Sequence, residues 1–382
     1  FNYDDLVPVA KFITETNHVE NVWNIPNTLN LASLSQDESD IDAGYTYVGQ
    51  FIDHDITLDP RPNDLTTPIN PYSLPNRRTP RLDLDSVYGN GPAGSPQLYE
   101  ADQMHLRLGA ALAGTPDAGA RDLPRDANGQ AIIGDPRNDE NVIVAQLHAV
   151  FLRFHNLWVD RVRAANPRWT PAQVFAEARR QVTLSYHYAI LTDFLPAVVG
   201  AKTMSDVFPQ SAGIPFWGPS ILFYDMCRAG MPVEFAVAAY RFGHSIVRPA
   251  YRLNTSFAKR LPIFAPEPRK PLDDAGRFRP IPRELGIDWR FFFDLGQTVA
   301  TGFPQAAYKP DAALVKALEN LPFPERGTES GVLGKRNLLR AMQLGLPSGQ
   351  DVARAMGFTP LRDEQIVIGT ATGDPTDAQP IT

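Results

Sequence analysis

Apolar side chains recur at helical spacing in three segments of the chain. The clearest segment covers residues 141–162, where apolar positions follow one another at intervals of three and four. Residues 171–195 show the same pattern, and the pair Thr170–Pro171 provides an N-cap and a proline at the first helical position. Residues 232–247 form the third segment. These segments predict three helices.

Proline-rich stretches separate the predicted helices. Residues 58–83 and 260–286 are the richest in proline, which breaks both helices and strand ladders, so they predict long ordered loops. Few segments alternate between apolar and polar residues as strands do. We therefore predict a mainly α-helical fold with a single large domain, residues 1–361, and long proline-rich loops. The last residues, 362–382, are polar and are predicted to form a disordered tail.

Composition narrows the function classes. The chain has 382 residues, 43% of them hydrophobic, which is enough for a full core. Its net charge is −7 without a long run of one sign, which argues against a nucleic-acid or anionic-membrane partner. No stretch of about 20 apolar residues predicts a transmembrane segment. Cys227 is the single cysteine, so no intrachain disulfide forms, and the start at Phe1 indicates a trimmed product without a visible targeting segment.

Four polar residues interrupt an apolar run in the segment "YVGQFIDHDITLDP". If residues 44–54 are helical, Gln50 and His54 share a face, and Asp53 lies about 100° around the same turn. One interpretation is a helix end whose acids, including Asp55, meet solvent. The other is a metal site in which acids flank a histidine. A zinc hydrolase fits less well, because no second histidine stands nearby at metal-ligand spacing.

A second constellation lies in "RTPRLDLDSVYG". Thr79, Arg81, Asp83 and Asp85 occupy every second position, which in an extended loop places them on one side. Two carboxylates, a hydroxyl and backbone carbonyls suit calcium, a cation that prefers oxygen ligands. A solvated acidic turn explains the same pattern, so this segment alone does not decide.

Two further segments carry isolated charged residues. Arg137 and Glu140 stand three residues apart just before the strongest predicted helix, where they could equally form a capping turn. His244 lies in an apolar segment, with Arg241 one turn before it. A lone histidine on an apolar face is more often a structural residue than a ligand.

Taken in order, these segments resemble one family. The series "GQFIDHD", "RTPRLDLDSVYG", "GDPRNDEN...FHN", "YRFGH" and "RNLLRAMQLGLP" is similar to the animal-type haem peroxidases of the peroxidase–cyclooxygenase superfamily. The resemblance covers roughly residues 20 to 360, and the lack of disulfides suggests a microbial branch. It implies a haem buried between distal and proximal helices and an extracellular, secreted enzyme.

The resemblance implies a distal triad. His54 matches the distal histidine, which would act as general base and then general acid on hydrogen peroxide. Arg137 matches the distal arginine, which would stabilise developing negative charge, and Gln50 matches the glutamine beside the iron. The implied reaction proceeds through a ferryl intermediate and oxidises small donors such as iodide, bromide, thiocyanate or phenols.

The resemblance also implies how haem is held. His244 matches the proximal iron ligand, and Asn337 matches the asparagine that supports its second nitrogen. Arg340 matches an arginine near a haem propionate, although the following "AMQLG" departs from the usual Arg-Asp-His-Gly. Arg241 is also expected to contact the cofactor.

Ester links to haem and a calcium site follow from the same motifs. Asp53 and Glu140 match the carboxylates that form these esters. Asn141 stands where myeloperoxidase has a methionine, so no third, sulfonium link is expected. The implied calcium ligands are Asp55, Thr79, the carbonyl of Arg81, Asp83 and Asp85, which would brace the distal helix.

Other functions stay open. A fatty-acid dioxygenase of the same superfamily would have a tyrosine three residues before His244, where this chain has Arg241 and Tyr240 is one residue off register. A non-catalytic calcium-binding interaction module would tolerate loss of His54 or Arg137. His148, His155 and His187 are interpreted as structural. Family members also continue past Leu361 into an apolar helical segment, so a further segment or a second chain is expected to complete that end.

Overall fold

The computed structural model describes residues 38–59, 65, 67–208, 230–265, 272–276, 278–297, 299–319, 321, 331–368 and 379–380. Within these residues the fold is mainly α-helical, as predicted, and the strands form only three two-stranded pairs. Cys227 lies outside the described residues. The elements that position the site are β1 (Glu38–Asp42), α2 (Gly44–Ile56), α3 (Asp85–Tyr88), η5 (Pro136–Asp139), α5 (Val142–Ala165), α6 (Pro171–Ala189), α8 (Val233–Val237), η7 (Ala239–His244), β4 (Ala306–Tyr308) and α9 (Leu333–Gln343).

The other elements are short or peripheral. A π-helical turn, η6, joins α6 to α7, so the predicted helix 171–195 continues further than expected. The remaining bounds are η3 (Pro71–Ser73), α4 (Gly91–Gly94), η4 (Pro96–Leu98), η6 (Ile190–Phe194), α7 (Leu195–Val207), β2 (Ala250–Tyr251), β3 (Leu261–Pro262), η8 (Arg283–Leu285), η9 (Trp289–Phe291), η10 (Lys316–Glu319), α10 (Gly349–Ala355), η12 (Asp363–Gln365), β5 (Val367–Ile368) and β6 (Gln379–Pro380).

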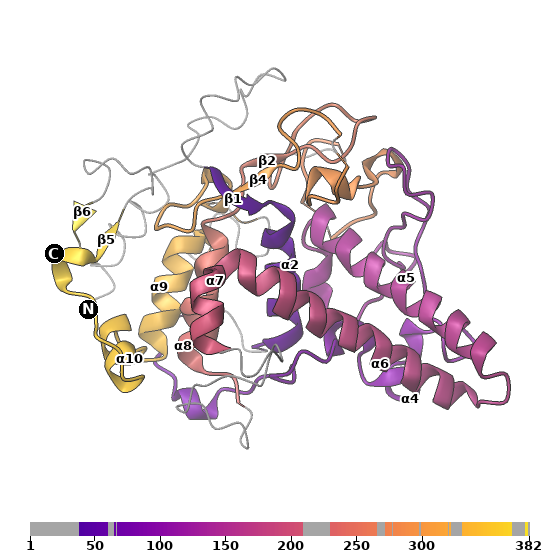
Figure 1. Cartoon of the computed structure of the whole chain (residues 1–382), viewed down its shortest axis with the longest axis horizontal. Coiled ribbons are helices and arrows are strands. Elements are labelled where there is room, and N and C mark those ends of the chain that lie inside the picture. The colour runs from indigo at the N-terminus through magenta and orange to yellow at the C-terminus, as the bar shows by residue number, and fades with distance from the viewer. Residues whose placement is uncertain are drawn as a thin grey trace.

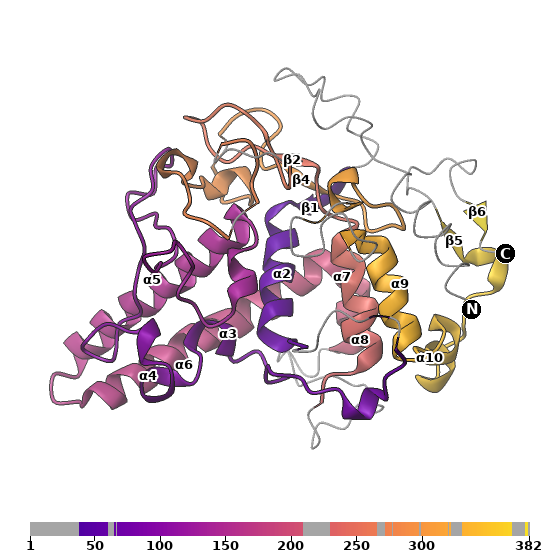
Figure 2. The ribbon, with the colours of Figure 1, turned by 180° about the vertical axis from the view of Figure 1, so that it is seen from behind.

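Helix α2 stands at the centre of the molecule (Figures 1 and 2). The long antiparallel pair α5 and α6 extends to one side of it, and α8 and α9 lie on the other. Phe51 on α2 stacks on Phe151 of α5 with ring centroids 4.7 Å apart, and Phe151 meets Tyr186 of α6 edge to face. This aromatic packing fixes α2 against the helical pair.

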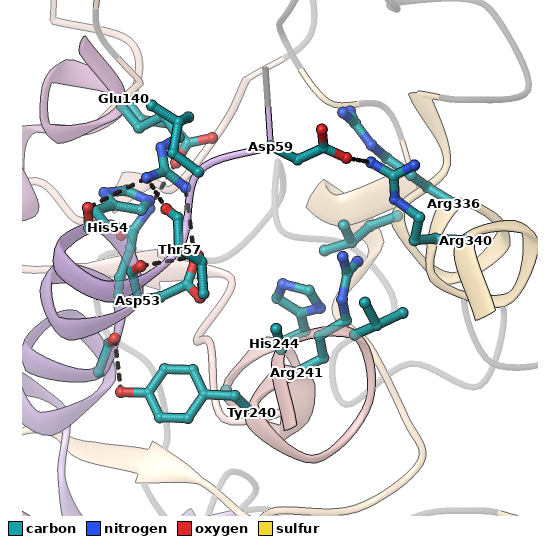
Figure 3. A pocket seen from close by; sticks show the side chains of 18 of the residues that line it. Asp53, His54, Thr57, Asp59, Glu140, Tyr240, Arg241, His244, Arg336 and Arg340 are labelled. Atoms are coloured by element: carbon teal, nitrogen blue, oxygen red, sulfur yellow. Dashed lines mark hydrogen bonds and ion pairs between the residues drawn. The ribbon is translucent and has the colours of Figure 1, made fainter. Parts of the chain in front are cut away.

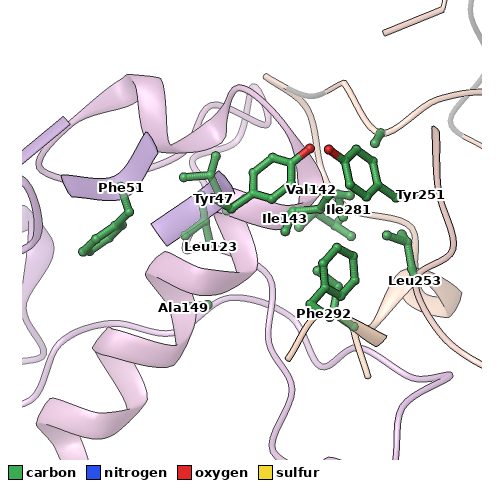
Figure 4. Close-up of a cluster of buried hydrophobic side chains, with 14 of the residues drawn as sticks. Tyr47, Phe51, Leu123, Val142, Ile143, Ala149, Tyr251, Leu253, Ile281 and Phe292 are labelled. Carbon is green, nitrogen blue, oxygen red and sulfur yellow. The ribbon is translucent and has the colours of Figure 1, made fainter. Parts of the chain in front are cut away.

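The start of α2 is set by a close approach of the chain. The Gly44 N–H donates to the Phe292 carbonyl at 2.9 Å, and a Cβ on Gly44 would lie only 2.2 Å from the Phe293 ring. Figure 4 shows Tyr47, Tyr251 and Phe292 packed in the core beside this point. A side chain at position 44 would therefore force the Phe293 ring to move, and the helix begins at the residue considered in the sequence analysis.

Two predicted elements differ from the structure. The helix expected over 232–247 breaks at Ala238 (φ −126°, ψ −73°), so α8 is followed by the 3-10 helix η7. A 3-10 turn has three residues, which brings Arg241 and His244 onto one face. The tail expected to be disordered instead holds η12 and the antiparallel pair β5–β6, as far as residues 362–368 and 379–380 describe it.

Two helical segments are long and apolar enough to cross a membrane by length and composition. They are α5 and the continuous stretch Pro171–Val207, with 61% and 22% of their most apolar windows buried inside the protein. This is weak evidence for a span, because a buried core helix passes the same test.

Candidate active site

One cavity of about 820 Å³ lies between the central helix α2 on one side and the elements α8, η7 and α9 on the other. His54 of α2 and His244 of η7 both line it, together with Glu140, Arg336 and Arg340 (Figure 3). A volume of this size falls within the range of roughly 300–1,000 Å³ that is usual for cofactor and ligand pockets. The cavity thus brings together residues that stand about 190 positions apart in the sequence.

His54 is buried and oriented by a side chain rather than by solvent. Its side chain is 5% exposed, and its Nδ1 lies 2.8 Å from the Asn138 Oδ1. Burial, followed by the positive charge of Arg137, lowers the pKa of His54 to about 4. The imidazole is therefore neutral at pH 7 and can accept a proton.

Arg137 is fixed by a buried carboxylate. Its Nε and Nη2 donate to the two carboxylate oxygens of Asp135 at 3.1 and 2.8 Å, and Nη2 also donates to the carbonyls of His54 and Thr57. Arg78 donates to the same Asp135 carboxylate at 2.8 and 3.0 Å. A bidentate guanidinium held this way keeps its charge in one place.

Asp135 was not among the predicted site residues. It is fully buried, and it also accepts from the Arg137 backbone N–H at 2.9 Å as the N-cap of η5. Burial alone would raise its pKa, but the hydrogen bonds and charge of Arg137 hold the pKa of Asp135 well below its ordinary value. The only sequence signal was an aspartate before a proline, which is typical of a helix N-terminus.

Gln50 lies between two residues from the η5–α5 junction. Its Nε2 donates to Glu140 at 2.6 Å, and its Oε1 accepts from Asn141 at 3.0 Å. Asn141 in turn caps α5 by accepting from the N–H groups of Ile143 and Val144. Both ends of the Gln50 amide are thereby oriented, and burial raises the pKa of Glu140 to about 7.

Asp53 reaches the cavity from the same helix as His54. Its Oδ1 accepts from the Thr57 hydroxyl at 3.0 Å, and its Oδ2 lies 3.9 Å from Arg137. Asp53 and Glu140 thus both line the cavity on the side of α2.

The opposite wall holds His244 and its partners. The His244 Nδ1 lies 3.0 Å from the Asn337 amide nitrogen, and the Asn337 oxygen accepts from Arg241. Burial, and then the charge of Arg241, lowers the pKa of His244 to about 3. Arg340 forms an ion pair with Asp59 at the rim. Arg336 also lines this wall. It is the first residue of the motif "RNLLRAMQLGLP", but in the sequence analysis only Asn337 and Arg340 of that motif are given a role.

The predicted calcium-binding loop, residues 79–85, lies next to the end of α2 that carries His54 and Asp55. Carboxylate oxygens of Asp55, Asp83 and Asp85 lie within 4.8 Å of one another. Asp55 is fully buried, and burial raises its pKa to about 7. Among the described residues, the buried Thr79 Oγ1 and Asp85 Oδ1 have no hydrogen-bond partner. The Asp85 Oδ1 also lies 3.6 Å from the Arg78 guanidinium. Buried carboxylate and hydroxyl oxygens without a hydrogen-bond donor are ligand atoms that calcium takes.

The loop geometry differs from the predicted extended one. Leu84 adopts a left-handed conformation, with φ 60°, and its N–H donates to Asp55 at 3.1 Å. The chain bends there, so strict alternation does not place the acids, and the Arg81 side chain is exposed. Of the other histidines, His155 contacts Tyr88 and the Met104 carbonyl. His187 lies 2.5 Å from the Leu82 carbonyl, outside the residues that line the cavity.

Two curated proteins are similar to part of this chain. Rat thyroid peroxidase is 30% identical over 237 residues, covering 57% of this chain and 24% of that protein, and Drosophila melanogaster peroxidasin is 27% identical over 196 residues, covering 48% and 12%. The chain therefore spans about a quarter or less of the length of these relatives.

Two solved structures share the fold. Peroxidase A from Dictyostelium discoideum has a TM-score of 0.54 at 19% identity, with 92% of this chain and 75% of that chain covered. Fatty acid alpha-dioxygenase from Oryza sativa has a TM-score of 0.60 at 16% identity, with 98% and 67% covered. The family model described as animal haem peroxidase matches residues 61–367, which is most of the chain. The chain belongs to the animal haem peroxidase family.

Proposed function

We propose that this protein is a haem peroxidase that uses hydrogen peroxide to oxidise small donors. One observation carries the proposal: two histidines from separate elements, the buried His54 and the half-buried His244, line one cavity, and a fixed guanidinium, Arg137, lies beside the first. The family membership implies the haem cofactor. The residues present fit a haem, because the cavity has the volume, a neutral imidazole and anchoring carboxylates that such a group needs.

When bound, the haem would supply the redox-active iron. His244 would ligate that iron through Nε2, which leaves the ring proton on Nδ1. Asn337 would then support Nδ1 with its amide oxygen, in place of the amide nitrogen that lies 3.0 Å from Nδ1 in this structure. Arg340 and Arg241 would face the propionates, and Asp53 and Glu140 would form the ester links.

His54 and Arg137 divide the work on peroxide. The neutral His54 takes a proton from the bound peroxide oxygen and returns it to the departing oxygen, acting as base and then acid. Arg137 stabilises negative charge as the O–O bond breaks, and Asp135 keeps it in place. Gln50, held by Glu140 and Asn141, presents its amide to the same space.

Calcium would brace the helix that carries these groups. Asp55 directly follows His54, and its raised pKa reflects a burial that the hydrogen bonds from Leu84 and Ser86 offset only in part and that a cation would relieve. With Asp83, Asp85, Thr79 and the Arg81 carbonyl, it would tie the loop before α3 to α2.

Haem extraction tests the proposed function. We expect haem to stay with the wild-type polypeptide in acidified organic solvent and to leave the double variant Asp53→Ala/Glu140→Gln, measured by the visible spectrum of each phase. Asp351→Ala, on the exposed surface of α10, is the control and should retain its haem. Haem that extracts from the wild type would contradict the ester links. A chain purified without haem after growth with ample iron would contradict the peroxidase itself.

Calcium removal should lower thermal stability. A cation present at 100 times its dissociation constant stabilises the folded state by about 2.7 kcal/mol. We expect calorimetry to show a lower Tm after chelation, and no calcium response in Asp83→Asn. Asp126→Asn, in an acidic turn outside the cluster, should respond as the wild type does. An unchanged Tm in the wild type would rule out the calcium site.

A fatty-acid dioxygenase is the second candidate. Tyr240 favours it, because this phenol lines the cavity and donates to the Gly49 carbonyl at 3.1 Å although it is off register in the sequence. Oxygen uptake with a polyunsaturated fatty acid, without peroxidase turnover, would establish it. Iodide, bromide, thiocyanate and phenols stay the proposed donors, and an extracellular location stays a prediction.

A further inference from the structure

A row of hydrogen bonds leads from the cavity into the core. His54 of α2 contacts the Asn138 oxygen of η5 at 2.8 Å, and the Asn138 nitrogen contacts the His148 Nδ1 of α5 at 2.9 Å. Asn138 and His148 are fully buried. In the sequence analysis, His148 is interpreted as a structural residue and no role is predicted for Asn138.

We propose that Asn138 and His148 are positioning residues that keep the proton of His54 on Nδ1, so that the lone pair of Nε2 faces the cavity. The inference rests on the proposed peroxidase function, because it concerns which nitrogen of His54 meets peroxide.

The amide has one accepting end and one donating end. With its oxygen toward His54, Asn138 accepts from Nδ1–H both before and after Nε2 takes up a proton. With the amide reversed, its NH2 group would face Nδ1, the proton would move to Nε2, and the ring would present no base to the cavity. Only the first orientation therefore lets His54 give and take a proton without losing a hydrogen bond.

The contacts of Asn138 correspond to the first orientation, because its oxygen lies toward His54 and its NH2 group lies toward His148. An NH2 group only donates, so the His148 Nδ1 accepts from it and a neutral His148 carries its proton on Nε2. This contact is the one side-chain hydrogen bond of His148 among the described residues. The charged groups around His54 are Arg137, Asp135 and Asp53, and none of them shows a hydrogen bond to the Asn138 amide.

The test reads the tautomer directly. In the reduced, carbon-monoxide-bound holoprotein, which is diamagnetic, ¹⁵N-histidine NMR should show the Nδ1 of His54 protonated and Nε2 unprotonated. Asn138→Leu and His148→Phe should mix the two tautomers and lower the second-order rate constant for hydrogen peroxide about tenfold or more. His148→Gln, whose side-chain oxygen can accept from Asn138, should restore both readouts in part.

His155→Gln is the matched control, because it alters another buried histidine of α5 that does not line the cavity. Unchanged tautomer signals in folded Asn138→Leu or His148→Phe, or an equal effect of His155→Gln, would overturn the inference. If Asn138→Leu fails to fold, His148→Phe and His148→Gln still decide. A wild type that binds haem but shows Nε2 protonated would refute the inference alone, whereas a wild type that binds no haem would refute the proposed function.

Discussion

Replacing His54 with leucine is expected to slow the reaction with hydrogen peroxide by about 10²–10⁴-fold while the haem stays bound. General acid–base catalysis contributes roughly this factor, and leucine fills the site without offering a nitrogen. The loss should fall on the rate constant for peroxide, because in the proposed site Asp53, Glu140 and His244 would hold the cofactor independently of His54. Stopped-flow mixing with peroxide at pH 7 measures it, and the absorption spectrum before mixing reports haem content.

The control for this variant is His105→Leu. His105 lies in a surface loop between Asp102 and Asp160, outside the cavity, and its replacement should leave the rate constant within twofold of the wild type. If His54→Leu also left the rate constant within twofold of the wild type, the proposed peroxidase mechanism would be wrong. The non-catalytic calcium-binding interaction module would then gain support.

The helices that the sequence predicted well are those with an apolar stripe along their whole length. Helices α5 and α6 begin close to the predicted positions, and the Thr170 cap is present with its partner Gln173. The prediction of one helix over residues 232–247 was wrong, because apolar spacing cannot distinguish an α-helix from a 3-10 turn. The turn that follows the break at Ala238 contacts α9 through Arg241 and Asn337, which is a tertiary contact that local spacing does not encode.

The residues of the candidate site also fall into those that the sequence could identify and those that it could not. Residues inside continuous motifs, such as Gln50, His54 and Arg137, could be singled out from their spacing and the family resemblance. The bland alternative for the first motif, a solvated helix end, does not hold for His54 and Asp55, which are both buried. Their burial, however, comes from contacts that no local pattern encodes.

The supporting residues were the ones that sequence reasoning missed. Arg78 and Asp135 are 57 positions apart, and nothing in either segment indicates that they meet. Asn138 reads as an ordinary loop residue until α2 and α5 are placed on both sides of it. Such residues become visible only when the packing of the helices is known.

The Asp135 carboxylate gathers two guanidinium groups in the interior, and its loss should be the most destabilising single change at the site. Its side chain is fully buried, and that of Arg78 is 9% exposed. Removing one partner of a buried ion pair leaves the other charge without compensation, which costs about 3–5 kcal/mol. Asp135→Ala is therefore expected to lower the free energy of unfolding by about that amount and to release Arg137 from its fixed position.

Glu177→Ala provides the comparison. The Glu177 carboxylate also accepts two hydrogen bonds from one guanidinium, that of Arg180, but on the exposed face of α6. A surface pair of this kind contributes little to stability, because water and salt screen the two charges. Denaturant unfolding of both variants should thus separate them by several-fold, and peroxide kinetics should be affected in Asp135→Ala alone. Equal small losses would mean that Arg78 and Arg137 find other partners or water, and that Asp135 does not hold the arginine in place.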